Sequence, residues 1–184
     1  PNMTVMHPCD DVSAAELTRQ CLDLSGPSYM RTARNKTMVL HENRIDDIKI
    51  GKGIVLRDGS DVCIIACGVL VAKALEAAEK LAGDGIDAGV VDMHTLKPLD
   101  GDLINRMAAS TGCIVSAEDH SIIGGLGGAI AEHLSSNHPI PLERVGVKDR
   151  FGESGQAEEM LDLLGLNTGD IIEAAHKAIS RKSN

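Results

Sequence analysis

The feature that most constrains the fold of this chain is a regular alternation between apolar, β-rich runs and helix-forming segments. The β-rich runs are residues 61–67 (DVCIIAC), 88–93 (AGVVDM), 112–117 (GCIVSA) and 142–147 (LERVGV). Runs that are apolar throughout indicate strands covered on both faces. Because helix-forming segments separate them, we expect an α/β fold, a three-layer sandwich with a mostly parallel sheet of about five strands.

Helix-forming segments separate these runs, and the one at 69–82 is rich in Ala, Leu, Glu and Lys. The segments are residues 69–82, 99–110, 125–134, 157–163 and 170–181. Trp is absent, and Tyr29 and Phe151 are the only aromatic residues, so aliphatic side chains and Met have to fill the core. We expect Phe151 to act as an anchor for its loop rather than as a stacking surface.

The first part of the chain has the pattern of a separate strand–helix–strand unit. A strand-like end at residues 5–6 precedes an Asp-capped helix at 12–24, and residues 28–32 resume an extended run. The polar, aperiodic stretch that follows is typical of a linker. We predict a remnant of a second α/β domain at 1–40, a linker at 41–53 and the main domain at 54–184. Because Pro1 leads almost at once into a strand-like pattern, we also expect a fragment or a processed chain.

Charge and composition narrow the class of protein. A net charge of −9 and a pI of about 5.2 exclude nucleic acid as the main partner, because phosphate backbones require a basic footprint. The five cysteines are odd in number and include no CxxC pair, so we expect buried, reduced thiols rather than disulfides or metal ligands. No run is long and apolar enough for a membrane span, so we expect a cytoplasmic protein without a membrane partner.

Three basic or imidazole side chains follow strand-like runs, where ligands of open α/β sheets bind. Arg31 and Arg34 lie in GPSYMRTARNK, and a guanidinium pair at a strand end can hold a phosphate or a carboxylate. His94 follows the run at 88–93, just before KPLD at 97–100. An alternative to each binding role remains open. Two arginines at the surface are common without a ligand. KPLD is equally typical of the start of a helix, with His94 bridging backbone groups.

A glycine-rich segment, AEDHSIIGGLGG, joins the run at 112–117 to the next helix. That helix begins with four glycines, Gly124, Gly125, Gly127 and Gly128. Its free N–H groups could bind an anion, or its small residues could allow close packing against another subunit. The spacing does not match GxGxxG. His120 follows two acidic residues, but no second His or Cys stands at ligand spacing, so no metal site is predicted.

Taken together, these strings resemble the transketolase family over almost the whole chain. PNMTV followed by GPSYMRTAR is similar to the closing strand–helix–strand of that family's pyrimidine-binding domain. IGKGIVLRDGSDVCIIACG, VVDMHTLKPLD, AEDHSIIGGLGGAIAEHL and VGVKDRFGESG are similar to successive strand ends of its C-terminal domain. The four strings occur in the family's order, which makes the resemblance far more specific than any one of them.

The resemblance implies a transferase of the pentose phosphate pathway that moves a two-carbon ketol group between sugar phosphates. Thiamine diphosphate with Mg²⁺ supplies the chemistry in that family. The ligands of both groups lie outside the strings found here, so we expect neither to bind this chain alone. The implied partners are an N-terminal cofactor-binding section and a second copy in a homodimer.

The resemblance assigns few roles to individual residues. Arg34 matches the arginine that contacts the substrate phosphate, with Arg31 beside it as a second candidate, and no catalytic residue is expected in this chain. His94, His120 and the glycines Gly124, Gly125, Gly127 and Gly128 are expected to position loops or to form an interface. Three alternatives stay open: a deoxyxylulose-phosphate synthase, in which Arg replaces His94, a 2-oxoacid dehydrogenase beta subunit, or a stand-alone regulatory domain that binds a small anion at residues 124–128.

Overall fold

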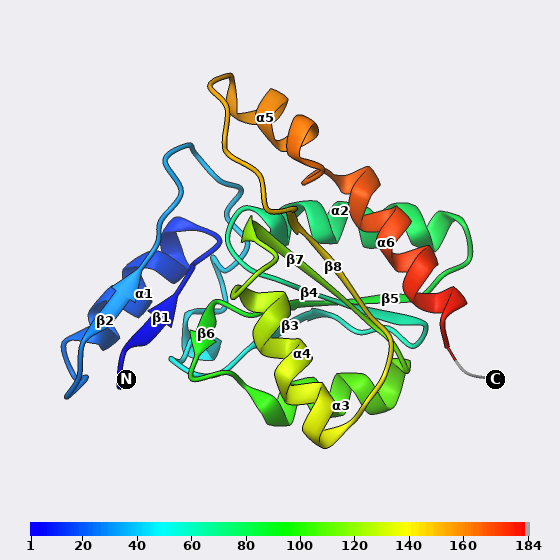
Figure 1. The fold of residues 1–184 in the computed structure, drawn as a ribbon. Helices are drawn as coiled ribbons and strands as arrows, with labels where there is room; N and C mark the ends of the chain where they lie inside the picture. Colours follow the sequence, from blue (N-terminus) through cyan, green and yellow to red (C-terminus); the bar gives the residue numbers. More distant parts are fainter. Residues whose placement is uncertain (183–184) are drawn as a thin grey trace.

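A five-stranded sheet forms the centre of the main domain (Figure 1). The computed structural model describes residues 1–182. The strands are β3 (Ile54–Arg57), β4 (Val62–Ala66), β5 (Ala88–Asp92), β7 (Ile114–Ser121) and β8 (Leu142–Val147), in the spatial order β3-β5-β4-β7-β8. Pairs β4–β5, β4–β7 and β7–β8 are parallel, and only β3 runs antiparallel to its neighbour. The predicted mostly parallel sheet of about five strands is therefore confirmed.

Helices cover both faces of this sheet, as expected for strands that are apolar throughout. Helices α2 (Leu70–Gly83) and α6 (Thr168–Ser180) lie on one face, and α3 (Gly101–Thr111) and α4 (Leu126–Asn137) lie on the other (Figure 1). Two separate clusters of buried aliphatic and thiol side chains fill the space between the sheet and the helices on each of its faces. Burying aliphatic surface on both sides is the main stabilising contribution of such a sandwich.

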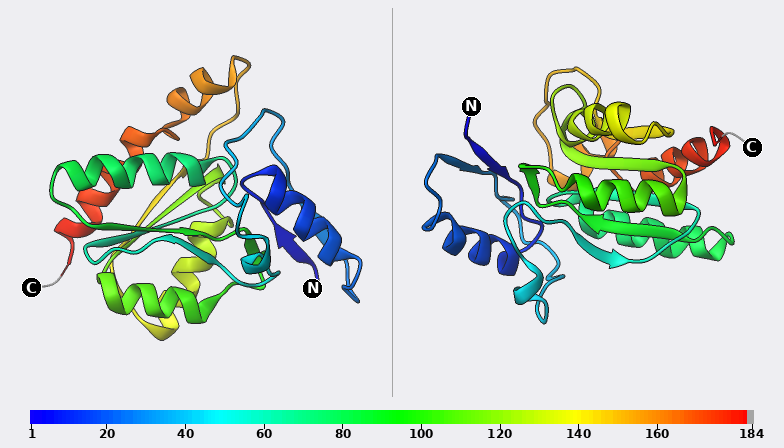
Figure 2. Two further views of the ribbon diagram at one scale, coloured as in Figure 1. Left: turned by 180° about the vertical axis from the view of Figure 1, so that it is seen from behind. Right: turned by 90° about the horizontal axis from the view of Figure 1, so that it is seen from below.

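The N-terminal unit forms a second, three-stranded sheet beside the main one (Figure 2). It contains β1 (Thr4–Met6), α1 (Asp11–Cys21), β2 (Ser28–Met30) and the 3₁₀ turn η1 (Ile45–Asp47). Asp10 caps α1, and its carboxylate accepts a 2.7 Å bond from the Ser13 backbone N–H. The third strand, β6 (Thr95–Lys97), comes from the main domain and pairs antiparallel with β1.

Strand β6 corrects one part of the sequence interpretation. Residues 95–97 are not only a helix entry, because they form the strand that joins the two units, and α3 starts after them with Asp100 as its cap. The predicted boundaries at residues 40 and 53 stay a prediction. The linker is nevertheless well packed at two points, since the side chains of His41 and Ile48 are buried.

The last part of the chain differs most from a closed sandwich. Helix α5 (Ala157–Leu164) stands away from the sheet and has no fully buried residue (Figure 1). Phe151, in the preceding loop, is 97% exposed, so the expectation that it anchors the loop is wrong within this chain. None of the helices in residues 1–182 is long and apolar enough to cross a membrane.

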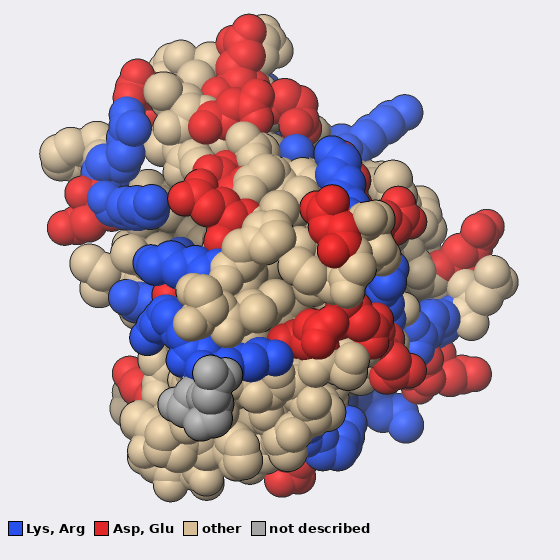
Figure 3. Space-filling model, turned by 90° about the vertical axis from the view of Figure 1, so that its right-hand side faces the viewer, with Lys and Arg blue, Asp and Glu red and all other residues tan. Residues whose placement is uncertain are grey.

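Surface charge is mixed around α6 and more acidic near α5. Figure 3 shows Lys and Arg beside Asp and Glu on the face next to α6, where Lys177 and Arg181 both pair with Glu143. Acidic side chains gather at the top of this view, at the height of α5, whose sequence includes Glu158 and Glu159. This face therefore carries no continuous basic stripe.

Candidate functional site

A cleft of about 1130 Å³ lies between residues 31–38, α2 and α5. Arg34 and Lys36 line it on the side of the N-terminal unit, and Glu76, Glu79 and Glu158 line it on the side of the helices. The cleft lies beyond the carboxyl ends of β4 and β7, the edge at which open α/β sheets bind their ligands. Charges of both signs border it.

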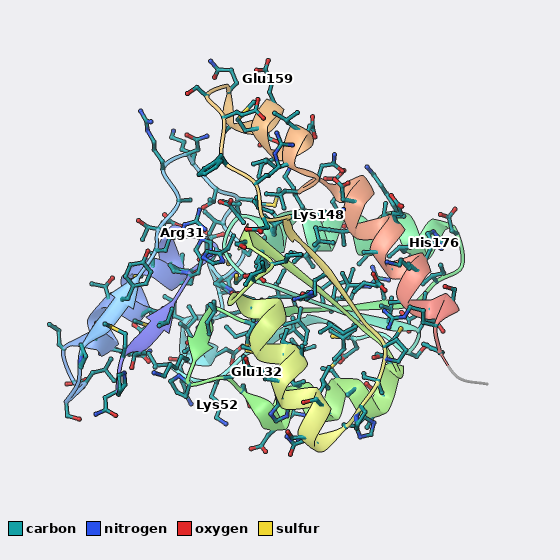
Figure 4. All side chains as sticks on the ribbon, viewed as in Figure 1. Arg31, Lys52, Glu132, Lys148, Glu159 and His176 are labelled. Carbon is teal, nitrogen blue, oxygen red and sulfur yellow. The ribbon has the colours of Figure 1, made fainter. Side chains whose placement is uncertain are left out.

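The two predicted arginines have different environments. Arg34 is exposed in the cleft and, within residues 1–182, makes no hydrogen bond or ion pair, so its guanidinium fork is free to bind an anion. Arg31 instead bridges the two units, because its guanidinium lies 2.8 Å from Asp119 Oδ2 and also donates to the Asp119 carbonyl oxygen. Figure 4 shows Arg31 between the N-terminal unit and the end of β7.

His7 and Cys9 reach the inner end of the cleft from the loop after β1. Burial and the nearby Arg31 lower the pKa of His7 to about 4, although Asp92 acts in the opposite direction. Its Nδ1 lies 3.6 Å from Cys67 Sγ. Burial raises the pKa of the Cys9 thiol, with further contributions from Asp92 and Asp10. At neutral pH this end of the cleft therefore carries an uncharged imidazole and an uncharged thiol.

His94 is buried in the joint between the units and does not line the cleft. Its backbone carbonyl accepts a 2.8 Å bond from His7 N–H, and its Nδ1 lies 2.9 Å from Thr95 Oγ1. Burial lowers the pKa of the His94 imidazole, so the neutral form predominates. This geometry places His94 away from solvent, and its expected role as a loop-positioning or interface residue stays a prediction.

The glycine-rich segment is organised by a buried carboxylate. Glu118, at the end of β7, accepts 2.7 Å and 2.8 Å bonds from the backbone N–H groups of Leu126 and Gly127. A Cβ at Gly125 would lie 2.0 Å from Glu118 Oε2, which explains the glycine there. Because this side chain already occupies the positive end of α4, the structure argues against a regulatory anion site at residues 124–128.

The remaining candidates of this segment lie at its surface. His120 is exposed, with Nδ1 2.9 Å from the Ser121 carbonyl oxygen and 3.9 Å from Glu118 Oε2. Gly124 is exposed with a φ of 73°, a conformation that glycine adopts without strain. Gly128 has open space where a Cβ would be. These residues are available for contact with another chain.

Among residues 1–182, neither the N-terminus of α4 nor a buried grouping of possible metal ligands suits thiamine diphosphate with Mg²⁺. The N-terminus of α4 is filled by Glu118. The buried grouping consists of Cys9, Asp10 and His41, whose potential ligand atoms lie within 4.8 Å of one another. This grouping is buried and offers a thiol and an imidazole, whereas Mg²⁺ prefers oxygen ligands and retained waters.

Sequence reasoning missed this buried grouping and also Asp92, which contacts it. Asp92 Oδ2 lies 3.3 Å from Cys9 Sγ and 2.8 Å from His41 Nε2. Cys9 and Asp92 are 83 positions apart, so no local spacing could reveal them. The only available signal was the polar Asp at the end of the apolar run at 88–93.

Comparison with known proteins gives consistent matches. The family described as "Transketolase, C-terminal domain" matches residues 51–171. A 6-deoxy-6-sulfo-D-fructose transketolase subunit of Clostridium sp. (strain MSTE9) is 44% identical over 183 residues, which cover 100% of this chain and 56% of that protein. A putative transketolase C-terminal section of Methanocaldococcus jannaschii is 44% identical over 175 residues, covering 94% of this chain and 54% of that protein.

A solved structure agrees with the fold in detail. The structure titled "Split gene transketolase, inactive beta4 tetramer" superposes with a TM-score of 0.94 at 43% identity, over 100% of this chain and 59% of the other. The chain thus spans little more than half the length of the relatives that it matches. The matched family, the identity and the superposition together show that this chain belongs to the transketolase family, as a C-terminal section that includes the transketolase C-terminal domain.

Proposed function

We propose that this chain is part of a thiamine-diphosphate-dependent transketolase that transfers a two-carbon ketol group between sugar phosphates. The observation that carries the proposal is the cleft in which Arg34 stands exposed and without a partner. Arg34 is the residue to which the family resemblance assigns the substrate phosphate. A free guanidinium can bind a phosphate through two parallel, charge-assisted hydrogen bonds.

In this proposal the two arginines act differently. Arg34 contacts the substrate phosphate. Arg31 positions the segment that carries Arg34, because its donors are directed to Asp119 at the end of β7. The segment from 31 to 38 is thus held against the main domain at its base, while its exposed part faces the cleft.

We further propose that the chain works only with a partner that supplies the cofactor site. The relatives named above are about twice its length, and neither place considered above suits the diphosphate and Mg²⁺. The missing cofactor site is then provided by an N-terminal section. Self-association into a homodimer is also proposed, and exposed apolar side chains of the N-terminal unit, Met3, Leu22 and Tyr29, support a covered surface there.

The test of the partner requirement is reconstitution. Thiamine diphosphate and Mg²⁺ are titrated by calorimetry into this chain alone and into its mixture with the N-terminal section, and ketol transfer is assayed in the same samples. We expect binding and turnover only in the mixture. Saturable cofactor binding by this chain alone would refute the proposal that an N-terminal section supplies the cofactor site.

The test of Arg34 uses the reconstituted enzyme. Loss of a charge-assisted hydrogen bond costs about 1.5–3 kcal/mol, so Arg34→Ala should lower kcat/KM for a phosphorylated ketose by roughly 10–100-fold, chiefly through KM. Arg34→Lys should recover part of the loss. Arg106→Ala, which removes an exposed arginine on α3 outside the cleft, is the matched control. An equal loss of kcat/KM with an unphosphorylated ketose would show that Arg34 does not contact the phosphate.

The substrate itself is tested with a panel. The name of the clostridial relative favours one further candidate, a ketose with a terminal sulfonate, which a guanidinium can also bind. Turnover of xylulose 5-phosphate supports the main proposal, and preference for 6-deoxy-6-sulfo-D-fructose supports the sulfonate. Turnover of pyruvate instead would identify a deoxyxylulose-phosphate synthase or a 2-oxoacid dehydrogenase part.

A further inference from the structure

The joint between the two units contains a compact set of metal-binding groups that the proposed reaction does not use. The potential ligand atoms of Cys9, Asp10 and His41 lie within 4.8 Å of one another. Asp92 Oδ2 is 3.3 Å from Cys9 Sγ and 2.8 Å from His41 Nε2. Tetrahedral donor atoms at about 2.0–2.3 Å from one Zn²⁺ ion lie roughly 3.3–3.8 Å apart, so small side-chain movements would let these groups converge on one ion.

The charges of this set are poorly balanced by the protein. Asp10 and Asp92 are both buried, and among residues 1–182 neither carboxylate has a Lys or Arg within ion-pair distance. His41 can offer at most one positive charge, to Asp92. Buried carboxylates without a compensating cation are costly, and a bound divalent ion removes that cost.

In the described part of the chain, two buried atoms of this set also lack a hydrogen-bond partner. They are Asp92 Oδ1 and His41 Nδ1, on side chains that are 0% exposed. His94 Nε2, on a side chain that is also fully buried, has no partner either. Buried polar atoms are nearly always paired in folded proteins, so unpartnered atoms gathered at one place indicate a missing ligand. A water molecule could pair with them but would leave the two carboxylate charges unbalanced.

The roles of the two carboxylates can be separated by their contacts. Asp10 Oδ1 accepts from the Ser13 N–H, and its Oδ2 accepts from the N–H groups of Leu40 and His41, each at 2.8 Å. Asp10 therefore holds the loop that brings His41 into place. Among the described residues, the Asp92 side chain hydrogen-bonds only to Cys9 and His41, through one oxygen, which leaves it free to act as a ligand.

We propose that Cys9, His41 and Asp92 bind a borderline-soft divalent cation such as Zn²⁺, with Asp10 as a positioning residue. A thiolate, an imidazole and a carboxylate are a ligand set that Zn²⁺ and Co²⁺ accept and that Mg²⁺ does not favour. Binding forms the metal–sulfur bond and releases the Cys9 thiol proton to solvent. The ion fastens residues 9–41 to the end of β5 and takes no part in the ketol transfer.

The test uses the full chain, freed of metal with a chelator and then titrated with Co²⁺. Tetrahedral Co²⁺ with a thiolate ligand gives a sulfur-to-metal charge-transfer band together with intense visible absorption. We expect both bands to saturate at one equivalent of Co²⁺ and to disappear when Zn²⁺ is added. The melting temperature should rise in the presence of Zn²⁺, because the ion binds the folded state.

Variants assign the ligands. Cys9→Ser should abolish the charge-transfer band, and Asp92→Asn should weaken Co²⁺ binding at least about 10-fold, as loss of a neighbouring contact already does in known metal sites. Cys113→Ser is the matched control, since this thiol is buried at the far end of the sheet, where it donates to the Asp61 carbonyl oxygen. Circular dichroism checks that each variant is folded.

Two results would overturn the proposal. One is a wild-type chain that shows no charge-transfer band and retains less than one equivalent of Zn²⁺ after dialysis. The other is a band that persists in Cys9→Ser and is lost in Cys113→Ser, which would place the metal elsewhere. Neither result depends on ketol transfer, so the metal site and the proposed transketolase function can fail independently.

Discussion

The contact between Glu118 and the start of α4 predicts opposite effects for two neighbouring Gly→Ala substitutions. A Cβ at Gly125 would lie 2.0 Å from Glu118 Oε2, the oxygen that accepts the Leu126 N–H at 2.7 Å. A Cβ at Gly128 would meet nothing within 4 Å. Gly125→Ala must therefore displace the carboxylate, whereas Gly128→Ala only exchanges one helical residue for another.

The magnitudes follow from these contacts. Displacing Glu118 loses at least one charge-assisted hydrogen bond, worth about 1.5–3 kcal/mol, and moves a negative charge away from the positive end of α4. Gly125 has a φ of −97°, which alanine also adopts, so no backbone strain is added. Gly128→Ala should gain up to about 1 kcal/mol, since alanine is the better helix former. The two variants should differ by about 3 kcal/mol in free energy of unfolding.

Urea unfolding of the isolated chain measures this difference directly. Gly125→Ala should unfold at lower urea and melt roughly 4–8 °C below the wild type, for a loss of about 2 kcal/mol. Gly128→Ala should be as stable as the wild type or more so. If Gly125→Ala were as stable as Gly128→Ala, the buried carboxylate would not be bonded to the start of α4, and the account of the glycine-rich segment would be wrong.

Two further predictions concern ion pairs. Burial opposes ionisation of Glu143, but hydrogen bonds from Lys177 and Arg181 outweigh it and leave the Glu143 pKa below its usual value. The stabilising effect of the Glu143 carboxylate is therefore present above the pKa that this group has in the unfolded chain, and it is lost as the pH falls through the lower pKa of the folded state. The Glu143→Gln variant lacks this carboxylate. Its free energy of unfolding should therefore fall less on acidification than that of the control variant Glu132→Gln, in which an exposed Glu is replaced. Arg31→Ala should cost about 1 kcal/mol in urea unfolding, less at high salt, because the Asp119 pair is partly exposed.

The main sheet was predictable from sequence because its strands carry their signal locally. Strand β4, with the sequence VCIIA, is apolar at every position, which is the pattern of a short strand covered on both faces. Shorter strands lack this signal. Strand β6 has three residues, of which only Thr95 is fully buried, and it is a strand only because β1 pairs with it.

The contacts of the candidate site could not be predicted from local sequence patterns for a similar reason. Asp119 holds Arg31 across 88 positions of sequence, and Asp92 meets Cys9 across 83. Pairing of this kind depends on how the N-terminal unit docks on the carboxyl edge of the sheet, which no periodicity encodes. By contrast, the prediction of Arg34 as an anion contact needed only its place after a strand and the family resemblance, and it remains a prediction.

The cleft and the buried cluster meet at Cys9, which lines the cleft and belongs to the cluster, so the two are linked physically. Residues 31–38 reach the cleft from β2, whose partner β1 is fixed by β6 and continues into the loop that carries Cys9. A substitution that weakens the contacts among Cys9, His41 and Asp92 therefore also weakens the pairing of β1 with β2, and this pairing positions Arg34. If Arg34 contacts the substrate phosphate as proposed, such a change should raise KM for a phosphorylated ketose while leaving KM for an unphosphorylated one less affected, because that contact depends on the placement of one side chain. The contact between the two units combines an apolar cluster, in which Met6 and Leu17 pack with Ile54, with these buried polar groups. Because a buried polar network depends on every one of its members, the placement of Arg34 should be sensitive to single substitutions there.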